Sequence, residues 1–158
     1  MVTLGITGHQ SLEPRTERAV TAMIIERLRD TRDVVGISSL AAGADQLFAR
    51  CVLDAGGRLV VVVPSAMYET TFASDVVRDE FLRLLTAATD VIRLQFAEPT
   101  EEAFYAAGKE IVDRCEILIA VWDSQPAGGL GGTGDVVKYA EEQGKAVVVL
   151  WPPGGKRS

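Results

Sequence analysis

The sequence has few of the side chains on which metal and redox chemistry depend. It contains one histidine and two cysteines in 158 residues. Cys51 and Cys115 do not form a CxxC pair, and a single histidine does not complete a usual zinc ligand set. We therefore expect two reduced cysteines in the core, no metal site and no bound cofactor.

Long apolar runs and clustered positive charge are scarce as well. The first residues, MVTLGITG, lack the basic start and long apolar stretch of a signal peptide. No apolar run approaches the roughly 20 residues that a membrane span needs. The formal net charge is −6, and no cluster of Lys and Arg offers a surface for neutralising phosphates. The sequence thus predicts a cytoplasmic protein with neither a membrane nor a nucleic-acid partner.

What the sequence does have is a regular alternation of short apolar runs and amphipathic segments. Runs such as LVVVV and AVVVL are typical of strands that are buried on both faces of a parallel sheet. The expected strands are Val2–Thr7, Val34–Ser38, Leu59–Val63, Val91–Leu94, Ile117–Val121 and Ala146–Leu150. The expected helices are Pro14–Asp30, Ala44–Ala55, Phe72–Ala88, Glu101–Cys115 and Thr133–Glu142.

This alternation predicts a single Rossmann-like α/β domain over residues 1–152, with a doubly wound, mainly parallel sheet and helices on both faces. Residues 153–158 are expected to form a frayed tail. In such a sheet, ligands bind beyond the carboxyl ends of the strands, near the point where the strand order reverses. Three loops at those ends have an unusual composition.

The first of these loops is TGHQS, residues 7–11, and its candidate contacts are Gly8, His9 and Gln10. Gly8 permits a sharp turn or a close approach of the backbone. His9 either donates to a ligand, acts as an acid or base, or braces the turn.

The second loop, SSLAAGAD, covers residues 38–45 and leads from a strand into a helix. Its small residues let a ligand approach the backbone, and the N–H groups at the helix start form a natural anion site. Asp45 contacts a ribose hydroxyl in one interpretation; in the other it is a first-turn carboxylate favoured by the helix dipole. The candidate contacts in this loop are Ser38, Gly43, Ala44 and Asp45.

The third loop contains GLGGTG, residues 129–134, which matches the dinucleotide-binding pattern G-x-G-x-x-G. That pattern belongs after the first strand, with an acidic residue about 20 positions later, whereas here it follows the penultimate strand. The position therefore excludes an NAD site of this type. Either the loop cradles a phosphate at a helix start, with Asp123, Gly131, Gly132 and Thr133 as contacts, or it is a plain surface loop with Thr133 as N-cap.

Together, the segments GITGHQ, SSLAAGAD and IVDRCEILIAVWDSQPAGGLGGTGDVVKYAEEQGKAVVVLWP resemble the SLOG superfamily. This Rossmann-like group contains the cytokinin-activating phosphoribohydrolases and the DNA-processing protein DprA, and the closest resemblance is to small stand-alone bacterial members. The resemblance covers nearly the whole chain. It implies a nucleotide or nucleoside-monophosphate ligand and a homodimer. By matching position, it carries over Gly8, Gly43, Asp45, Gly131, Gly132 and Thr133 as ligand contacts.

The chain departs from the phosphoribohydrolases where those enzymes place their catalytic groups. Their motif P-G-G-x-G-T-x-x-E has a glutamate in the helix after the loop, and a partner arginine lies upstream. Here residues 136–138 are Val, Val and Lys, and residues 107–109 are Ala, Gly and Lys. We therefore predict a sensor or regulatory module that binds a nucleotide or a nucleotide-derived small molecule. The alternative is a nucleoside-monophosphate phosphoribohydrolase in which Asp123 or Asp135 replaces the glutamate.

Overall fold

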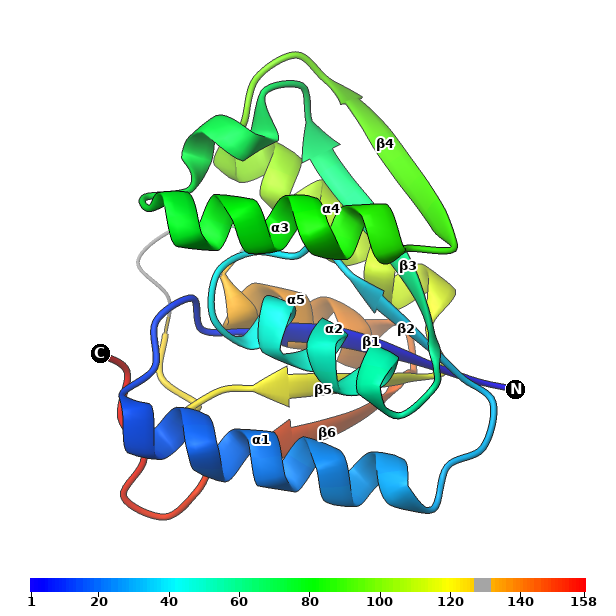
Figure 1. Cartoon of the computed structure of the whole chain (residues 1–158), viewed down its shortest axis with the longest axis vertical. Helices are drawn as coiled ribbons and strands as arrows, with labels where there is room; N and C mark the ends of the chain where they lie inside the picture. Colours follow the sequence, from blue (N-terminus) through cyan, green and yellow to red (C-terminus); the bar gives the residue numbers. More distant parts are fainter. Residues whose placement is uncertain (127–131) are drawn as a thin grey trace.

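The computed structural model describes residues 1–126 and 132–158. In this part of the chain, six parallel strands form one sheet in the order β4-β3-β2-β1-β5-β6 (Figure 1). The strands are β1 (Val2–Gly8), β2 (Val34–Ser38), β3 (Arg58–Ser65), β4 (Asp90–Phe96), β5 (Ile117–Val121) and β6 (Ala146–Leu150). The helices are α1 (Pro14–Arg29), α2 (Ala44–Asp54), α3 (Asp75–Ala87), α4 (Glu101–Arg114) and α5 (Thr133–Glu142), with a short 3-10 helix η1 (Tyr68–Thr71). The predicted doubly wound, Rossmann-like α/β fold is confirmed.

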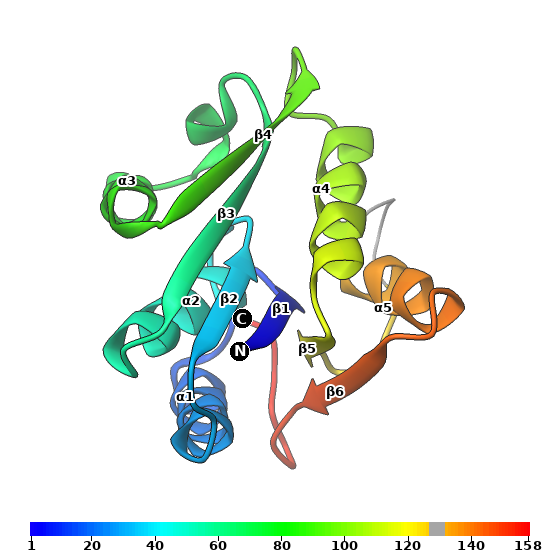
Figure 2. The same ribbon diagram turned by 90° about the vertical axis from the view of Figure 1, so that its right-hand side faces the viewer.

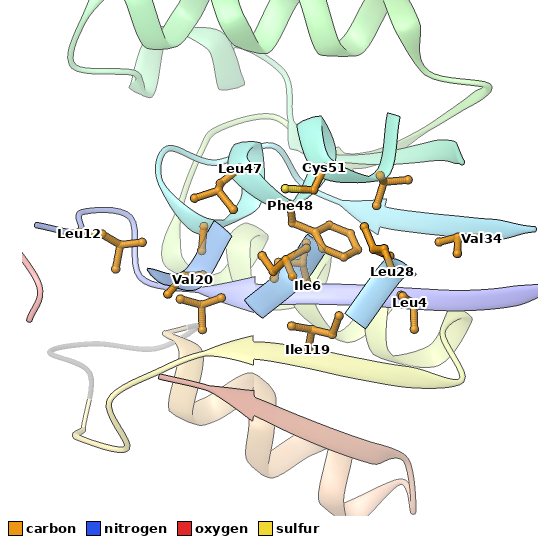
Figure 3. Packing of buried hydrophobic residues seen from close by; sticks show 14 residues of the cluster. Leu4, Ile6, Leu12, Val20, Leu28, Val34, Leu47, Phe48, Cys51 and Ile119 are labelled. Carbon is orange, nitrogen blue, oxygen red and sulfur yellow. The ribbon is translucent and has the colours of Figure 1, made fainter. Parts of the chain in front are cut away.

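Helices cover both faces of the sheet. Helices α1, α2 and α3 lie on one face, and α4 and α5 lie on the other (Figure 2). On the first face, Leu4 and Ile6 of β1 pack with Val20 of α1 and with Leu47 and Phe48 of α2 (Figure 3). This double cover explains why the inner strands are apolar throughout, because both of their faces are removed from water. No helix in the described part of the chain is long and apolar enough to cross a membrane.

Both cysteines lie in the core, as expected, Cys51 in the cluster with Leu4 and Phe48 and Cys115 in the cluster with Ile111 and Val136. Cys51 and Cys115 are free and buried, and burial raises the pKa of each thiol. Because the thiolate is the reactive form, both side chains act as small apolar groups rather than as nucleophiles.

One helix begins later than the sequence pattern predicts. The apolar spacing places its start at Phe72, whereas α3 begins at Asp75. Ser74 is the reason, because its hydroxyl accepts a hydrogen bond from the Val77 N–H (3.2 Å) and caps the helix. Phe72 is left in extended backbone, where it packs beside Tyr68.

The strand order reverses between β1 and β5. Strand β1 pairs with β2 on one side and with β5 on the other. Strands β2, β3 and β4 are therefore added in turn on one side of β1, and β5 and β6 are added on its other side. The loops after β1 and β5 therefore flank the topological switch point, which is where ligands bind in sheets of this kind.

The C-terminal tail, which the sequence led us to expect frayed, is held against the loop after β1. Leu12 and Arg157 form an antiparallel bridge. The Glu13 N–H donates to the Lys156 carbonyl (3.2 Å), and the Lys156 N–H donates to the Thr16 hydroxyl (2.9 Å). These bonds join residues more than 130 positions apart, so local composition gives no sign of them. They bring the tail to the switch point.

Candidate functional site

A pocket of about 640 Å³ opens at the carboxyl edge of the sheet, and its size suits a small-molecule ligand. Its walls come from the loops after β1, β2, β3 and β5, from α4, from the first turns of α2 and α5, and from the C-terminal tail. Six of the candidate residues line it: Gly8, His9, Gln10, Asp45, Gly132 and Thr133. The structure thus brings parts of all three candidate loops to one place.

His9 joins the loop after β1 to the loop after β5. Its Nε2 accepts a hydrogen bond from the Asp123 N–H (3.1 Å), and its ring packs edge-on against Trp151, with 5.4 Å between the centroids. Burial, together with the Arg157 guanidinium, lowers the pKa of His9 below its ordinary 6.5, although the Asp123 carboxylate acts in the opposite direction. His9 is therefore neutral at pH 7, and the 3.2 Å approach of Nε2 to Asp123 Oδ1 is not an ion pair. His9 both braces the loop and lines the pocket.

Asp123 positions an arginine that the sequence analysis missed. Arg157 forms a bidentate ion pair with it, from Nε to Oδ2 (2.7 Å) and from Nη2 to Oδ1 (2.8 Å). This pair and the Gln125 N–H (2.9 Å to Oδ1) hold the pKa of Asp123 at about 2. Arg157 lines the pocket and Asp123 does not. Asp123 therefore acts on the pocket through Arg157. The sequence around Arg157 contains no motif that would have predicted an arginine of the tail at this site.

Gly8, Gly43 and Ala44 hold the first and second loops together. A Cβ on Gly8 would lie 2.5 Å from the Ala44 Cβ. Gly43 has a φ of 78°, and a Cβ on it would lie 2.5 Å from the Gln10 carbonyl oxygen. The Ala44 N–H donates to the His9 carbonyl (3.1 Å). At this N–H the start of α2 therefore binds a protein carbonyl, where the sequence analysis expected an anion.

Ser38 and Asp45 connect the end of β2 to the start of α2. The Ser38 hydroxyl donates to the Asp45 carbonyl (3.2 Å) and accepts from the Leu40 N–H (3.0 Å). Ser38 is fully buried, so its bonds shape the turn. The Asp45 side chain instead lines the pocket, and its Oδ2 accepts from the Ala41 N–H (3.3 Å). Burial raises the pKa of Asp45 to about 7, against the smaller opposing effect of that hydrogen bond.

The first turn of α5 forms another part of the wall. Gly132 is the N-cap and Thr133 is the first helical residue, so Thr133 is not the N-cap that the surface-loop alternative assumed. Thr133 is buried, and Gly132, Thr133 and Gly134 all line the pocket. The positive end of the α5 dipole therefore lies at the pocket. Gly131, the remaining candidate in this loop, lies outside the described residues.

A close apolar contact occupies the segments in which the phosphoribohydrolases carry their arginine and glutamate. Val136 of α5 packs directly onto Gly108 of α4: a Cβ on Gly108 would lie 2.6 Å from Val136 Cγ2. Both residues line the pocket. The packing of α4 on α5 thus leaves no room for a long side chain at Gly108, and this wall of the pocket is apolar. Among the residues that the structure describes, no group of three His, Cys, Asp or Glu side chains could hold a metal ion.

The fold, with its pocket at the switch point, defines a Rossmann-like α/β domain. Neither a scan against protein-family models nor a search of curated proteins gives a match. Among solved structures, the chain is similar to DprA from Streptococcus pneumoniae, with 17% identity and a TM-score of 0.67 over 94% of this chain and 50% of that chain. It is also similar to DprA from Helicobacter pylori, with 15% identity and a TM-score of 0.70 over 96% of this chain and 66% of that chain.

A third similar structure is the molybdenum cofactor carrier protein from Chlamydomonas reinhardtii. Its identity is 15% and its TM-score is 0.53, over 94% of this chain and 75% of that chain. The chain therefore spans one half to two thirds of the DprA chains that it matches. The resemblance to the SLOG superfamily that the sequence indicated is confirmed at the level of the fold.

The similarity to DprA overturns the prediction that nucleic acid is not a partner. The Helicobacter pylori protein binds single-stranded DNA, and its fold matches nearly the whole of this chain. The prediction was wrong because it used net charge, which is a sum over the whole molecule, whereas binding depends on where individual Lys and Arg side chains lie. A formal charge of −6 is therefore no ground for excluding nucleic acid with this fold.

Proposed function

We propose that the pocket binds a nucleotide or a nucleotide-derived small molecule, and that the chain acts as a sensor or regulatory module. One observation carries the proposal. The pocket at the switch point combines a helix start and an arginine, which suit an anion, with aromatic side chains, which suit a base.

The anionic part of the ligand belongs at α5. Gly132 and Thr133 present the positive end of the helix, and the Thr133 hydroxyl is a further donor. Arg157 uses Nε and Nη2 for Asp123 and Gln125, and its Nη1 has no partner within the described residues. Nη1 is therefore available for a charge-assisted hydrogen bond to a phosphate oxygen.

The base belongs near β3, on the other side of the switch point. Phe72 and Phe104 line the pocket there and are half-buried. Both pack edge-on against the buried Tyr68, with centroid distances of 5.3 Å and 6.0 Å. Rings that are fixed in this way offer a flat ligand an apolar surface at little cost in conformational entropy.

The apolar contact between Gly108 and Val136 favours binding over cleavage. Cleavage of an N-glycosidic bond needs a carboxylate to stabilise the developing positive charge. In the segments where the related enzymes hold their charged pair, this pocket has a glycine against a valine. We therefore propose recognition of the intact nucleotide.

Isothermal titration with a panel tests the proposal. The panel contains the four ribonucleoside monophosphates, their 2′-deoxy forms, cyclic and linear dinucleotides, and a short single-stranded DNA oligonucleotide. We expect at least one mononucleotide or dinucleotide to bind with one site per chain. Binding of the oligonucleotide alone, or of nothing by a folded protein, would overturn it.

A further inference from the structure

We infer that Asp45 recognises a hydrogen-bond donor of the ligand, an N–H or O–H group, and that the ligand displaces a proton from this carboxyl when it binds. The inference rests on the proposed function, because it concerns the same pocket. Asp45 is then a second recognition point in the pocket, separate from the anion site at α5. Because its carboxyl loses a proton when the ligand binds, the affinity depends on pH.

The carboxyl of Asp45 is enclosed but poorly satisfied. The residue is 8% exposed, and its side chain lines the pocket. Its one hydrogen bond within the described residues comes from the Ala41 N–H to Oδ2, and at 3.3 Å it is long. A buried carboxylate ordinarily has a cation or several donors. At Asp45, Oδ1 has neither among the residues that the structure describes.

A second polar group in the same wall also lacks a partner. The Ser39 hydroxyl is buried and forms no hydrogen bond in the described part of the chain, although Ser39 lines the pocket. Buried polar atoms are nearly always paired, so two deficient groups on one pocket wall indicate a place that a ligand completes. Ser39 can donate or accept, whereas an ionised Asp45 only accepts.

The surroundings of Asp45 favour a donor over an anion. His9 lines the same pocket and is neutral, Tyr68 of η1 is held neutral by burial, and Arg157 is engaged by Asp123. On the side of α3, Glu80 is paired with Arg50 (3.4 Å). Among the residues that the structure describes, no cation therefore balances a charge on Asp45, while its position in the first turn of α2 favours the ionised form.

The proton balance follows from this setting. Burial holds a proton on the unliganded carboxyl up to about pH 7. When an N–H or O–H group of the ligand donates to the carboxylate, that group takes the place of the missing protein partner and lowers the pKa. The proton then leaves to solvent, so binding is tighter at higher pH. An anionic group is repelled from Asp45, which orients the ligand with its phosphate toward α5.

Titration of the wild type and of Asp45→Asn at pH 6 and pH 8 tests the inference. The probes are AMP, GMP, CMP and UMP with their 2′-deoxy forms, each in two buffers of different ionisation enthalpy. Asn keeps an acceptor for the Ala41 N–H but has no proton to lose. We expect the affinity ratio of wild type to Asp45→Asn to rise about tenfold from pH 6 to pH 8, the change in the ionised fraction of a group that titrates near 7.

The ligand phosphate also titrates in this range, but it is common to both titrations and cancels in the ratio. Asp54→Asn is the matched control, because Asp54 lies on the same helix but lines a separate groove beside α1. We expect it to behave as wild type. If the pH dependence of the ratio is lost with the 2′-deoxy probes, the donor is the ribose 2′-hydroxyl. If it persists, the donor is the 3′-hydroxyl or a group on the base.

The results that would overturn the inference differ in whether they also contradict the proposed function. Equal affinities and equal pH profiles for wild type and Asp45→Asn would overturn it while leaving nucleotide binding intact. No binding of any probe would overturn the proposed function and this inference together. If the variant does not fold, the wild type alone decides: binding at pH 7 without proton release to the buffer contradicts the inference.

Discussion

Single residues give the pocket its chemistry, and three of them have pKa values that their surroundings move in different directions. Burial without a cation raises that of Asp45 to about 7, whereas the Arg157 ion pair lowers that of Asp123 to about 2. Burial lowers the pKa of His9. At neutral pH the pocket therefore holds a neutral imidazole, a partly protonated acid and an arginine with its charge balanced. Such separation of pKa values is typical of functional sites.

The buried acid should destabilise the fold above neutral pH. The pKa of Asp45 is raised from 3.8 to about 7 in the folded state, so its contribution to stability is lost as pH rises between these values. At pH 8 the folded protein carries a desolvated carboxylate, and Asp45→Asn removes it. We expect the variant to be more stable at pH 8 by a few kcal/mol, up to about 4, with a melting temperature several degrees higher.

Thermal unfolding followed by circular dichroism measures this effect. At pH 4, close to the pKa of 3.8 that the carboxyl has in the unfolded chain, the difference between the two proteins should largely disappear. A variant that is less stable than wild type at pH 8 would show that Asp45 is a structural carboxylate after all.

The single histidine offers a direct probe of the tail. Because the chain has one His, its ring C–H resonances can be followed by NMR without assignment. We expect the His9 pKa to lie below 6.5 in wild type and to rise in Arg157→Gln, since the guanidinium is one of the groups that lower it. An unchanged pKa in Arg157→Gln would mean that the tail does not lie at the pocket in solution.

Among the elements, the sequence pattern was sufficient to locate the strands. It was insufficient to predict the start of α3 or the position of the C-terminal tail beside the pocket. Apolar runs located all six strands, and those of the inner strands are continuous because burial on both faces leaves little room for polar side chains. The edge strand β4 is interrupted by Arg93 and Gln95. The start of α3 depended on the Ser74 cap, which outweighed the apolar spacing. The place of Arg157 depended on hydrogen bonds between residues distant in the sequence, which no local pattern encodes. Ser39 was not among the candidate contacts, because its lack of a hydrogen-bond partner within the described residues is visible only in three dimensions.

The packing of α4 on α5 predicts opposite outcomes for two glycines in these helices. A Cβ on Gly108 would lie 2.6 Å from the buried Val136, whereas a Cβ on Gly134 would lie an ordinary 3.4 Å from the Trp122 ring. We expect Gly108→Ala to destabilise the protein by about 1 kcal/mol or more, because overpacking outweighs the better helix propensity of Ala. Gly134→Ala should be neutral or stabilising by about 0.5–1 kcal/mol.

Urea unfolding of the two variants beside wild type measures both effects in one experiment. The sign of each change is the decisive result. Equal effects of the two substitutions would mean that α4 and α5 do not approach as closely as the structure shows.

For the molecule as a whole, the pocket depends on bringing distant segments to one edge of one sheet. Residues from the first strand, the second loop, the start of α5 and the last residues of the chain meet around the pocket at the switch point. The sequence located the first three of these, because the carboxyl ends of parallel strands are the expected place for a ligand. It failed on the nucleic-acid partner, since a summed charge carries no information on position.

A matched pair of variants tests the proposed anion site at α5. Gly132 is the N-cap of α5, and both Asp and Asn are favourable at that position, so both substitutions preserve the helix. They differ in a single negative charge at the place proposed for the ligand phosphate.

The measurement is isothermal titration of the tightest-binding nucleotide of the panel into wild type, Gly132→Asp and Gly132→Asn. We expect Gly132→Asp to weaken binding by about 100-fold or more, the order of about 3 kcal/mol for a repelled charge, and Gly132→Asn to stay within a few-fold of wild type. Equal binding by both variants would contradict the proposed anion site, because the phosphate would then lie away from α5.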